Sequence, residues 1–194
     1  MIYLASKSTI RLRILKDAGV EVQTIASHFD EEEAQQELAK LSPRALSLAL
    51  ATGKAQHVTT ASPSALVIGA DQTLEHDGET LHKPRSLPEA EAQLLRLRGD
   101  VHQLYSSVAC CQDGEILWSF TDSAELQMRD FSLAFMRHYL QGEGDNVLQT
   151  VGCYRLEGLG TQLFKHIAGD YFTMLGLPLM RLLDFLRSHG ELQT

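Results

Sequence analysis

Apolar and polar residues along the chain follow two periods, which predict strands and helices in turn. Short apolar runs at residues 2–5 and 65–69 predict buried strands, and a looser alternation at 20–26 predicts another. Helix-spaced apolar residues predict helices at 9–18, 42–57, 86–97 and 131–140, and a C-terminal helix that opens at Leu177-Pro178. Residues 27–33 are expected to form a polar loop with a dense acidic cluster.

Two Asp-Gly pairs in the middle of the chain predict hairpins. Asp77-Gly78 follows the strand at 65–69, and Asp113-Gly114 separates the runs 101–111 and 115–128. The second hairpin is expected to place four residues in the core: Val108, Ala109, Ile116 and Trp118. Interleaved helices and strands predict an α/β domain, and the antiparallel hairpins require a mixed sheet. We expect two lobes with a cleft between them.

Composition and charge narrow the class of protein. The 194 residues, 44% hydrophobic and 22% charged, suit one globular domain and exclude a disordered or low-complexity chain. The net charge of −8 argues against a nucleic-acid partner, so a small polyanion would require the few cations to gather in one place. No signal peptide or apolar run of about 18 residues is visible, so neither secretion nor a membrane is expected. Three cysteines, two of them adjacent, suit reduced thiols in the cytoplasm.

Two segments carry the strongest candidate chemistry. A strand leads directly into a helix start at Ser8, and the free N–H groups there favour an anion that Arg11 can bind with two hydrogen bonds. Solvated helix capping is the alternative, and neither a P-loop nor a dinucleotide fingerprint is present. Asp71 is expected at the C-terminal end of the strand at 65–69, where a carboxylate can hold Mg²⁺ or orient a water. A turn aspartate that caps backbone amides is the alternative.

Four other positions have both a functional and an ordinary interpretation. Lys83, before Pro84, can present a charge to phosphate, as can Lys54 within its helix, but both also suit a surface lysine. Glu31, within the acidic run 30–33, suits either a metal site or a solvated face. Glu157, in the glycine-punctuated segment 152–160, can accept hydrogen bonds from a base, or it belongs to an ordinary turn.

The order and spacing of these segments resemble the Maf family of nucleotide pyrophosphatases, named for septum formation, over nearly the whole chain. The similarity rests on these blocks: residues 4–8 (LASKS) with Arg11, 29–31 (FDE), Lys54-Ala55, 67–71 (VIGAD), Lys83-Pro84, 97–102 (LRGDVH), 152–158 (GCYRLEG), 168–171 (AGDY) and 176–179 (GLPL).

The resemblance implies an enzyme that hydrolyses a nucleoside triphosphate to the monophosphate and pyrophosphate with Mg²⁺ or Mn²⁺. It implies one catalytic domain over residues 1–194, with two α/β lobes around a central cleft, an inosine-triphosphatase-like architecture, and often a homodimer. Asp71 matches the catalytic acid/base of the family. The matches to its phosphate and metal site are Ser8, Arg11, Lys54, Lys83 and, with Asp71 for the metal, Glu31.

Positions that vary within the family, or depart from its pattern, bear on which nucleobase the substrate carries. Gln72 and Glu157 resemble the subclass that acts on 7-methyl-GTP, and a carboxylate can accept hydrogen bonds from guanine N1–H and its 2-amino group. Ile10 stands where that subclass has Trp and where dTTP- and UTP-hydrolysing members have Arg. Thr9 replaces a proline, and Thr150 replaces a lysine. The alternatives are therefore a dTTP/UTP-preferring pyrophosphatase and a nucleotide-binding division regulator without catalysis.

Overall fold

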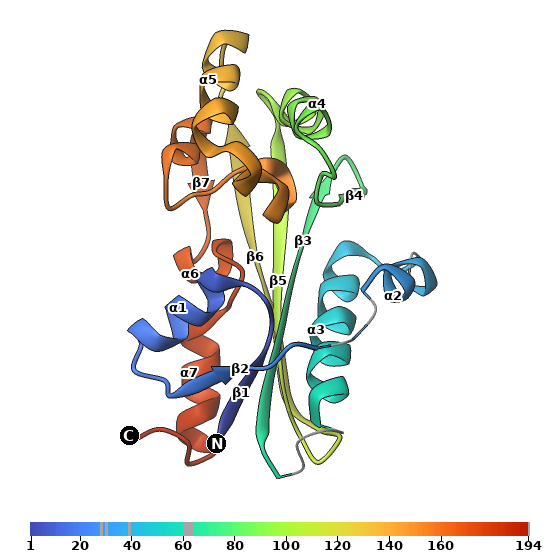
Figure 1. The fold of residues 1–194 in the computed structure, drawn as a ribbon, viewed down its shortest axis with the longest axis vertical. Helices are drawn as coiled ribbons and strands as arrows, with labels where there is room; N and C mark the ends of the chain where they lie inside the picture. Colours follow the sequence, from blue (N-terminus) through green and yellow to red (C-terminus); the bar gives the residue numbers. More distant parts are fainter. Residues whose placement is uncertain (28, 30, 39, 60–63, 194) are drawn as a thin grey trace. The chain divides into compact units, whose positions relative to one another are not determined.

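The computed structural model describes residues 1–27, 29, 31–38, 40–59 and 64–193, with the backbone alone at 31–33. In this part of the chain, seven strands form one mixed sheet in the order β2-β1-β3-β5-β6-β7, with β4 paired to β3 (Figure 1). The strands are β1 (Ile2–Ala5), β2 (Val22–Thr24), β3 (Leu66–His76), β4 (Glu79–Leu81), β5 (Val101–Gln112), β6 (Glu115–Met128) and β7 (Phe164–Ala168). The α/β class with a mixed sheet is therefore confirmed.

The helices lie between these strands in sequence and vary in length. The α-helices are α1 (Thr9–Asp17), α2 (Glu31–Glu37), α3 (Pro43–Thr59), α4 (Leu87–Leu97), α5 (Leu133–Glu143), α6 (Tyr171–Met174) and α7 (Leu179–Ser188). The 3₁₀ helices are η1 (Gly144–Gln149), η2 (Val151–Cys153) and η3 (Leu159–Leu163). None of the described helices is long and apolar enough to cross a membrane.

The chain divides into two compact units. The first comprises Met1–Gln72, Tyr105–Asp122 and Asp170–Thr194, and the second comprises Thr73–Leu104 and Ser123–Gly169. Strands β3, β5 and β6 thus contribute residues to both units.

The first unit packs helices on both faces of its strands. β1 runs parallel to β2 and β3, and Figure 1 shows α1 and α7 on one side of these strands and α3 on the other. Side chains alternate between the two faces of a strand, so every second residue meets the same helices. In β3, Leu66, Ile68 and Ala70 join the cluster with α1 and α7, whereas Val67 joins the cluster with α3. This alternation decides the face to which each polar residue later in β3 is directed.

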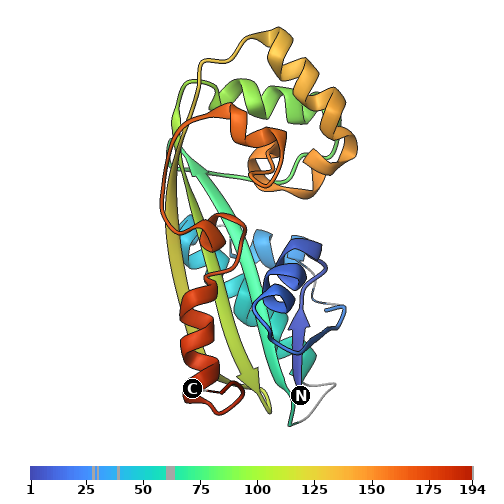
Figure 2. The same cartoon turned by 90° about the vertical axis from the view of Figure 1, so that its left-hand side faces the viewer.

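The second unit pairs the distal part of β3 with β4 and that of β6 with β7, both antiparallel. Helix α4 packs against α5 and against the η1 and η2 turns (Figure 2). The core of the second unit contains buried residues of both strands and helices, among them Leu74, Leu94, Leu104, Met136 and Tyr139.

Several sequence expectations were wrong in detail. β3 continues to His76, so Asp71 lies inside a long strand and not at its end. The predicted polar loop at 27–33 gives way to helix α2 from Glu31. Ile116 is 47% exposed and lies outside the core, whereas Val108 and Ala109 are buried as expected and Trp118 packs partly buried against the core. Strand β7 and helix α6 were not predicted, because segments of five and four residues are too short to show a clear period.

Candidate active site

A buried ion pair joins the middle of β3 to helix α3. Asp71 is the residue after Ala70, so its side chain points to the α3 face, where Lys54 Nζ lies 2.6 Å from Asp71 Oδ1. The side chain of Asp71 is 11% exposed, and that of Lys54 is 7% exposed. Glycine at position 69 permits this contact, because a Cβ there would clash with the carbonyl oxygen of Ala51 and with Ala55 in α3. The helix can therefore lie close enough for Lys54 to reach the strand.

Helix α1 starts where the sequence predicted, and the binding of an anion there stays a prediction. Ser8 is the N-cap of the helix, and its hydroxyl oxygen accepts a hydrogen bond from the backbone N–H of Arg11 at 3.4 Å. The Arg11 side chain turns toward the strands, where Nη1 donates to the Ala70 carbonyl at 2.9 Å and Nε donates to the Gly176 carbonyl at 2.8 Å. Arg11 therefore contacts the residue immediately before Asp71.

Gln72 lies on the opposite face of β3 from Asp71. Its side-chain amide nitrogen donates to the Ser106 hydroxyl at 2.9 Å and to the carbonyls of Thr173 and Met174 at 3.2 and 3.1 Å. In the first unit, Lys54 therefore meets Asp71 on one face of β3, Gln72 lies on the other face, and Arg11, from the helix that Ser8 caps, binds the carbonyl of Ala70.

Two other expected site residues belong to the second unit. Lys83 follows β4, and Glu157 lies in the turn between η2 and η3. The Glu157 carboxylate accepts a hydrogen bond from Arg155 Nε at 3.0 Å, and Arg155 also contacts Glu143 at 3.2 Å. These carboxylates raise the pKa of the Arg155 guanidinium. The gathering of Lys83 and Glu157 with Asp71 stays a prediction.

The remaining expected residues have local roles or lie outside the described side chains. The side chain of Glu31 lies outside the described residues, so its metal role stays a prediction. Ile10 packs against the core cluster formed with α1 and α7, and Thr9 is the exposed first residue of α1. The Thr150 hydroxyl donates to the Val147 carbonyl at 3.3 Å.

The carboxylate of Asp71 suits a hard cation only in part. Among the described residues, no three His, Cys, Asp or Glu side chains gather as a metal site. Mg²⁺, however, commonly binds through one or two carboxylates together with substrate phosphates. The donor chemistry at Asp71 therefore fits a metal that arrives with a polyphosphate.

Polar residues that the sequence analysis missed support the strand around the ion pair. Ser106 in β5 is fully buried, and its hydroxyl donates to the Thr173 carbonyl at 2.6 Å. The Thr173 hydroxyl donates to Asp122 at 2.8 Å. A signal was present in the sequence, since Ser106 and Ser107 interrupt a strand that is otherwise largely apolar.

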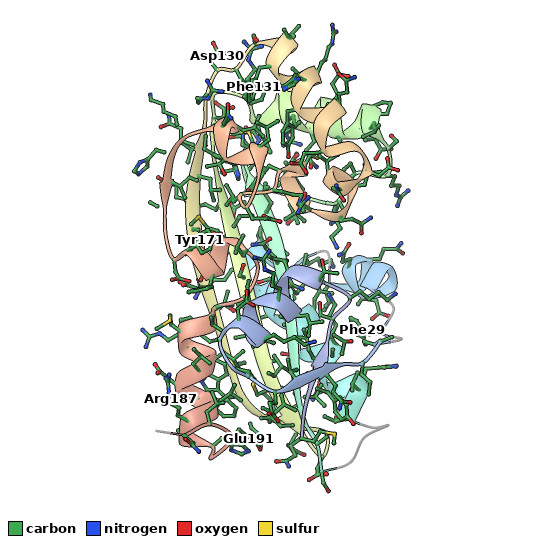
Figure 3. The ribbon with its side chains drawn as sticks, turned by 60° about the vertical axis from the view of Figure 1, so that its left-hand side comes forward. Phe29, Asp130, Phe131, Tyr171, Arg187 and Glu191 are labelled. Atoms are coloured by element: carbon green, nitrogen blue, oxygen red, sulfur yellow. The ribbon has the colours of Figure 1, made fainter. Side chains whose placement is uncertain are left out.

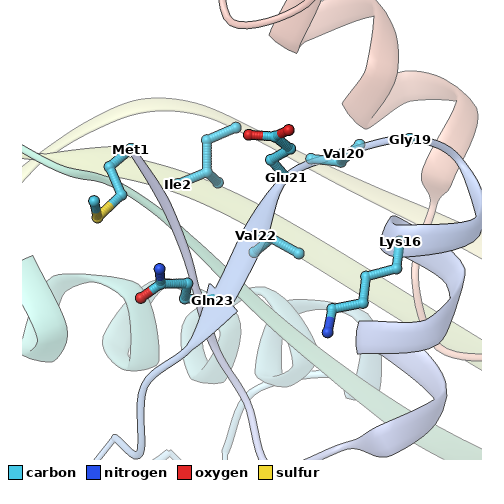
Figure 4. A pocket seen from close by; sticks show the side chains of 8 residues that line it. All are labelled: Met1, Ile2, Lys16, Gly19, Val20, Glu21, Val22 and Gln23. Atoms are coloured by element: carbon cyan, nitrogen blue, oxygen red, sulfur yellow. The ribbon is translucent and has the colours of Figure 1, made fainter.

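A separate pocket of about 640 Å³ lies beside β2, lined by the N-terminus, β2 and the turn after α1 (Figure 4). Its wall combines apolar residues with the polar side chains of Lys16, Glu21 and Gln23. None of the expected site residues whose side chains are described lines it.

Fold and site together define an α/β protein with a buried lysine–aspartate pair in the middle of its sheet, next to an arginine that supports the same strand. Residues 1–189 match the model of the family described as Maf-like protein, so the chain belongs to the Maf family.

Curated relatives match over nearly their full length. A protein of Caulobacter vibrioides named nucleoside triphosphate pyrophosphatase is 49% identical, over 97% of this chain and 96% of the relative. A protein of Rhizobium johnstonii named 7-methyl-GTP pyrophosphatase is 42% identical over the same shares of the two chains. Among solved structures, a nucleoside-triphosphatase/dITP/XTP pyrophosphatase of Mycobacterium abscessus has a TM-score of 0.46 at 14% identity, covering 96% of this chain and 99% of the other.

Proposed function

We propose that this chain is an enzyme that hydrolyses a nucleoside triphosphate to the monophosphate and pyrophosphate. The observation that carries the proposal is the buried contact of 2.6 Å between Lys54 Nζ and Asp71 Oδ1. Burying two charges is costly, so a buried ion pair of this kind marks a candidate functional site. Family membership and the names of the curated relatives support the same reaction.

The described side chains suit attack of water on the α-phosphorus. Asp71 accepts a proton from the attacking water, the new bond forms from the water oxygen to phosphorus, and the bond to the pyrophosphate oxygen breaks. Lys54 offsets negative charge beside that carboxylate, and Arg11 secures the preceding carbonyl. A divalent cation, bound through Asp71 and the phosphates, would supply additional stabilisation of negative charge.

The preferred substrate in this proposal is a nucleoside triphosphate with a modified guanine base. Glu157 supplies a carboxylate that suits the N1–H and 2-amino donors of guanine, and Arg155 holds it from one side at 3.0 Å. The name of the Rhizobium johnstonii relative agrees with this preference. A cytoplasmic location and a homodimer remain predictions from the sequence and its resemblance to the family.

The test is a panel of nucleoside triphosphates assayed for pyrophosphate release with Mg²⁺ and with Mn²⁺. We expect 7-methyl-GTP to be hydrolysed with a higher kcat/KM than dTTP or UTP. The reverse order would overturn the guanine preference, and no release from any nucleotide would favour the non-catalytic regulator.

The catalytic role of Asp71 is tested by Asp71→Asn, with Glu75→Gln as the matched control. Both residues lie on β3, and both changes replace a carboxylate by an amide of the same shape. We expect Asp71→Asn to lower kcat by at least about a hundredfold, the scale of general acid–base catalysis. Glu75→Gln should retain wild-type kcat, and equal turnover in the two variants would refute the assignment.

A further inference from the structure

A chain of charged side chains lies at the C-terminal end of α5 in the second unit. Helix α5 follows Phe131, labelled in Figure 3, and ends at Glu143. Arg155 Nη1 donates to Glu143 Oε2 at 3.2 Å, and Arg155 Nε donates to Glu157 Oε1 at 3.0 Å. One guanidinium therefore bridges two carboxylates, one from the helix and one from the turn between η2 and η3.

The two carboxylates of this chain differ in exposure. The side chain of Glu143 is 11% exposed, whereas that of Glu157 is 23% exposed. Hydrogen bonds between ions are stronger than neutral ones, and the planar fork of an arginine fixes their direction. Glu143 is therefore the anchored end of the chain, and Arg155 transmits that anchoring to the more accessible carboxylate of Glu157.

The backbone on both sides of Glu157 is held as well. The Thr161 hydroxyl donates to the Leu156 carbonyl at 2.5 Å and lies 3.0 Å from the Gly158 carbonyl. The backbone of Gly160 lies so close to that of Arg155 that a Cβ there would clash with it. Since the turn is held in this way, the direction of the Glu157 carboxylate depends on its own side chain and on Arg155.

The Glu157 carboxylate keeps the capacity to bind a base after Arg155 has bound it. An ionised carboxylate offers about four lone-pair sites, and Arg155 Nε occupies one of them. Guanine presents two neighbouring donors, N1–H and the 2-amino group, whereas uracil presents one N–H between two carbonyl oxygens that a carboxylate repels. A carboxylate already held in one orientation binds the guanine edge with a smaller loss of side-chain freedom.

The charges of the three side chains sum to −1 at neutral pH, because two carboxylates flank one guanidinium. Methylation at N7 gives guanine a positive charge, so a cluster with net negative charge attracts the methylated base more than the unmethylated one. Without Glu143 the pair of Arg155 and Glu157 would be neutral. Glu143 thus anchors Arg155 and also sets the net charge of the cluster.

We propose that Arg155 and Glu143 are positioning residues for base recognition, which orient the Glu157 carboxylate toward guanine and keep the cluster negative for a 7-methylated guanine. The inference rests on the proposed function, and it adds Arg155 and Glu143 to the residues that decide which base is preferred. It concerns the second unit alone, because all three side chains and the turn that carries Glu157 belong to that unit.

Two variants and one control test the proposal. Arg155→Gln removes the guanidinium, and Glu143→Gln removes one negative charge while keeping the shape of the side chain. Arg96→Gln is the control, because Arg96 also pairs with a glutamate of the second unit, Glu79, at 2.7 Å. Thermal unfolding of each variant shows whether the protein still folds.

Two ratios of kcat/KM separate orientation from charge. The ratio of GTP to UTP reports the orientation of Glu157, because neither base is charged, and we expect Arg155→Gln to lower it about tenfold, mainly through KM. The ratio of 7-methyl-GTP to GTP reports the charge of the cluster, and Glu143→Gln should lower it about threefold. Arg96→Gln should keep both ratios at the wild-type value.

Two outcomes would overturn the proposal. The first is that both ratios stay at the wild-type value in Arg155→Gln and in Glu143→Gln. The second is an equal fall of kcat/KM for all three nucleotides, because a role confined to folding would weaken the enzyme without regard to the base.

A binding measurement separates this proposal from the proposed function. Titration calorimetry with 7-methyl-GMP, GMP and UMP gives a Kd for each base without any turnover. We expect the wild type to bind 7-methyl-GMP most tightly, and the two variants to change the ratios of Kd as they change the ratios of kcat/KM. If the wild type releases no pyrophosphate from any nucleotide, the proposed function fails, and the Kd ratios alone decide the role of Arg155 and Glu143. Equal binding of the three nucleotides by the wild type would refute that role.

Discussion

Acid should destabilise this protein strongly through one histidine in the second unit. His102 on β5 is 2% exposed, and its Nε2 lies 2.8 Å from the Tyr154 hydroxyl. The rings of Tyr154 and Phe164 lie within 5.5 and 6.1 Å, and His76 is near enough to oppose a second positive charge. Burial first, and His76 second, lower the pKa of His102 from 6.5 to about 4.

The direction of this pH effect depends on whether the folded or the unfolded protein binds the proton more tightly. Between pH 6.5 and about 4 the histidine of the unfolded chain is protonated while the buried one is neutral, so acid favours unfolding. The stabilisation is complete above pH 6.5 and is lost as the pH falls to about 4. At about 1.4 kcal/mol for each pH unit, the free energy of unfolding falls by about 3 kcal/mol over this interval.

The assay is urea unfolding of the wild-type protein and of His102→Gln at several pH values between about 7 and 4. Glutamine can accept a hydrogen bond from Tyr154 but cannot be protonated in this range. We expect the wild type to lose about 3 kcal/mol more than His102→Gln over the interval. His138→Gln, a change at an exposed histidine on α5, is the control and should follow the wild type. Parallel pH profiles of wild type and His102→Gln would refute the reasoning.

Three further results are expected in the first unit and at the thiols. Asp71→Asn and Lys54→Met should each lower the free energy of unfolding by about 3 kcal/mol, because each leaves the other charge of a buried pair behind. In a double-mutant cycle the combined variant should lose clearly less than the sum, and additive losses would contradict the pairing. Gly69→Ala should lower the free energy of unfolding by about 1–3 kcal/mol and impair turnover, because the new Cβ pushes α3, which carries Lys54, away from β3. Unchanged values in unfolding and pyrophosphate-release assays would disprove the close approach of helix and strand. Burial raises the pKa of Cys111 to about 11 and that of Cys153 to about 12, and it also raises that of Cys110. A thiol reagent at mildly alkaline pH should therefore label the native protein slowly and the unfolded protein rapidly, and fast labelling of native protein would show that these thiols are accessible.

Local signals in the sequence predicted many of the elements well. Helices α1 and α4 form where they were expected, with Ser8 and Ser86 as their N-caps, and both Asp-Gly pairs form hairpin turns, with Asp77 and Asp113 at positive φ. The predicted C-terminal helix forms and buries four leucines at helical spacing: Leu179, Leu182, Leu183 and Leu186. Caps, turns and amphipathic spacing act within a few residues, so the sequence contains what is needed to find them.

The length of β3 could not be predicted in the same way. The apolar run ends at Gly69, so the strand was expected to stop there, with Asp71 at its C-terminal end. In the structure the polar residues after Gly69 stay in the strand, because their polar groups find partners from distant segments: Lys54 for Asp71, and Ser106 for Gln72. A polar residue in a buried strand is tolerated when its hydrogen bonds are satisfied, and that depends on residues far away in the sequence.

The sequence by itself determined the family, the α/β class and the identity of the charged residues that suit a polyphosphate. Tertiary structure alone decided that Lys54 and Asp71, 17 positions apart, meet at 2.6 Å. It also decided that Gln72 faces away from them, toward carbonyls about 100 positions later in the chain. Spacing along a strand sets which face each side chain occupies, but only the packing of helices against the sheet determines which residues it contacts there.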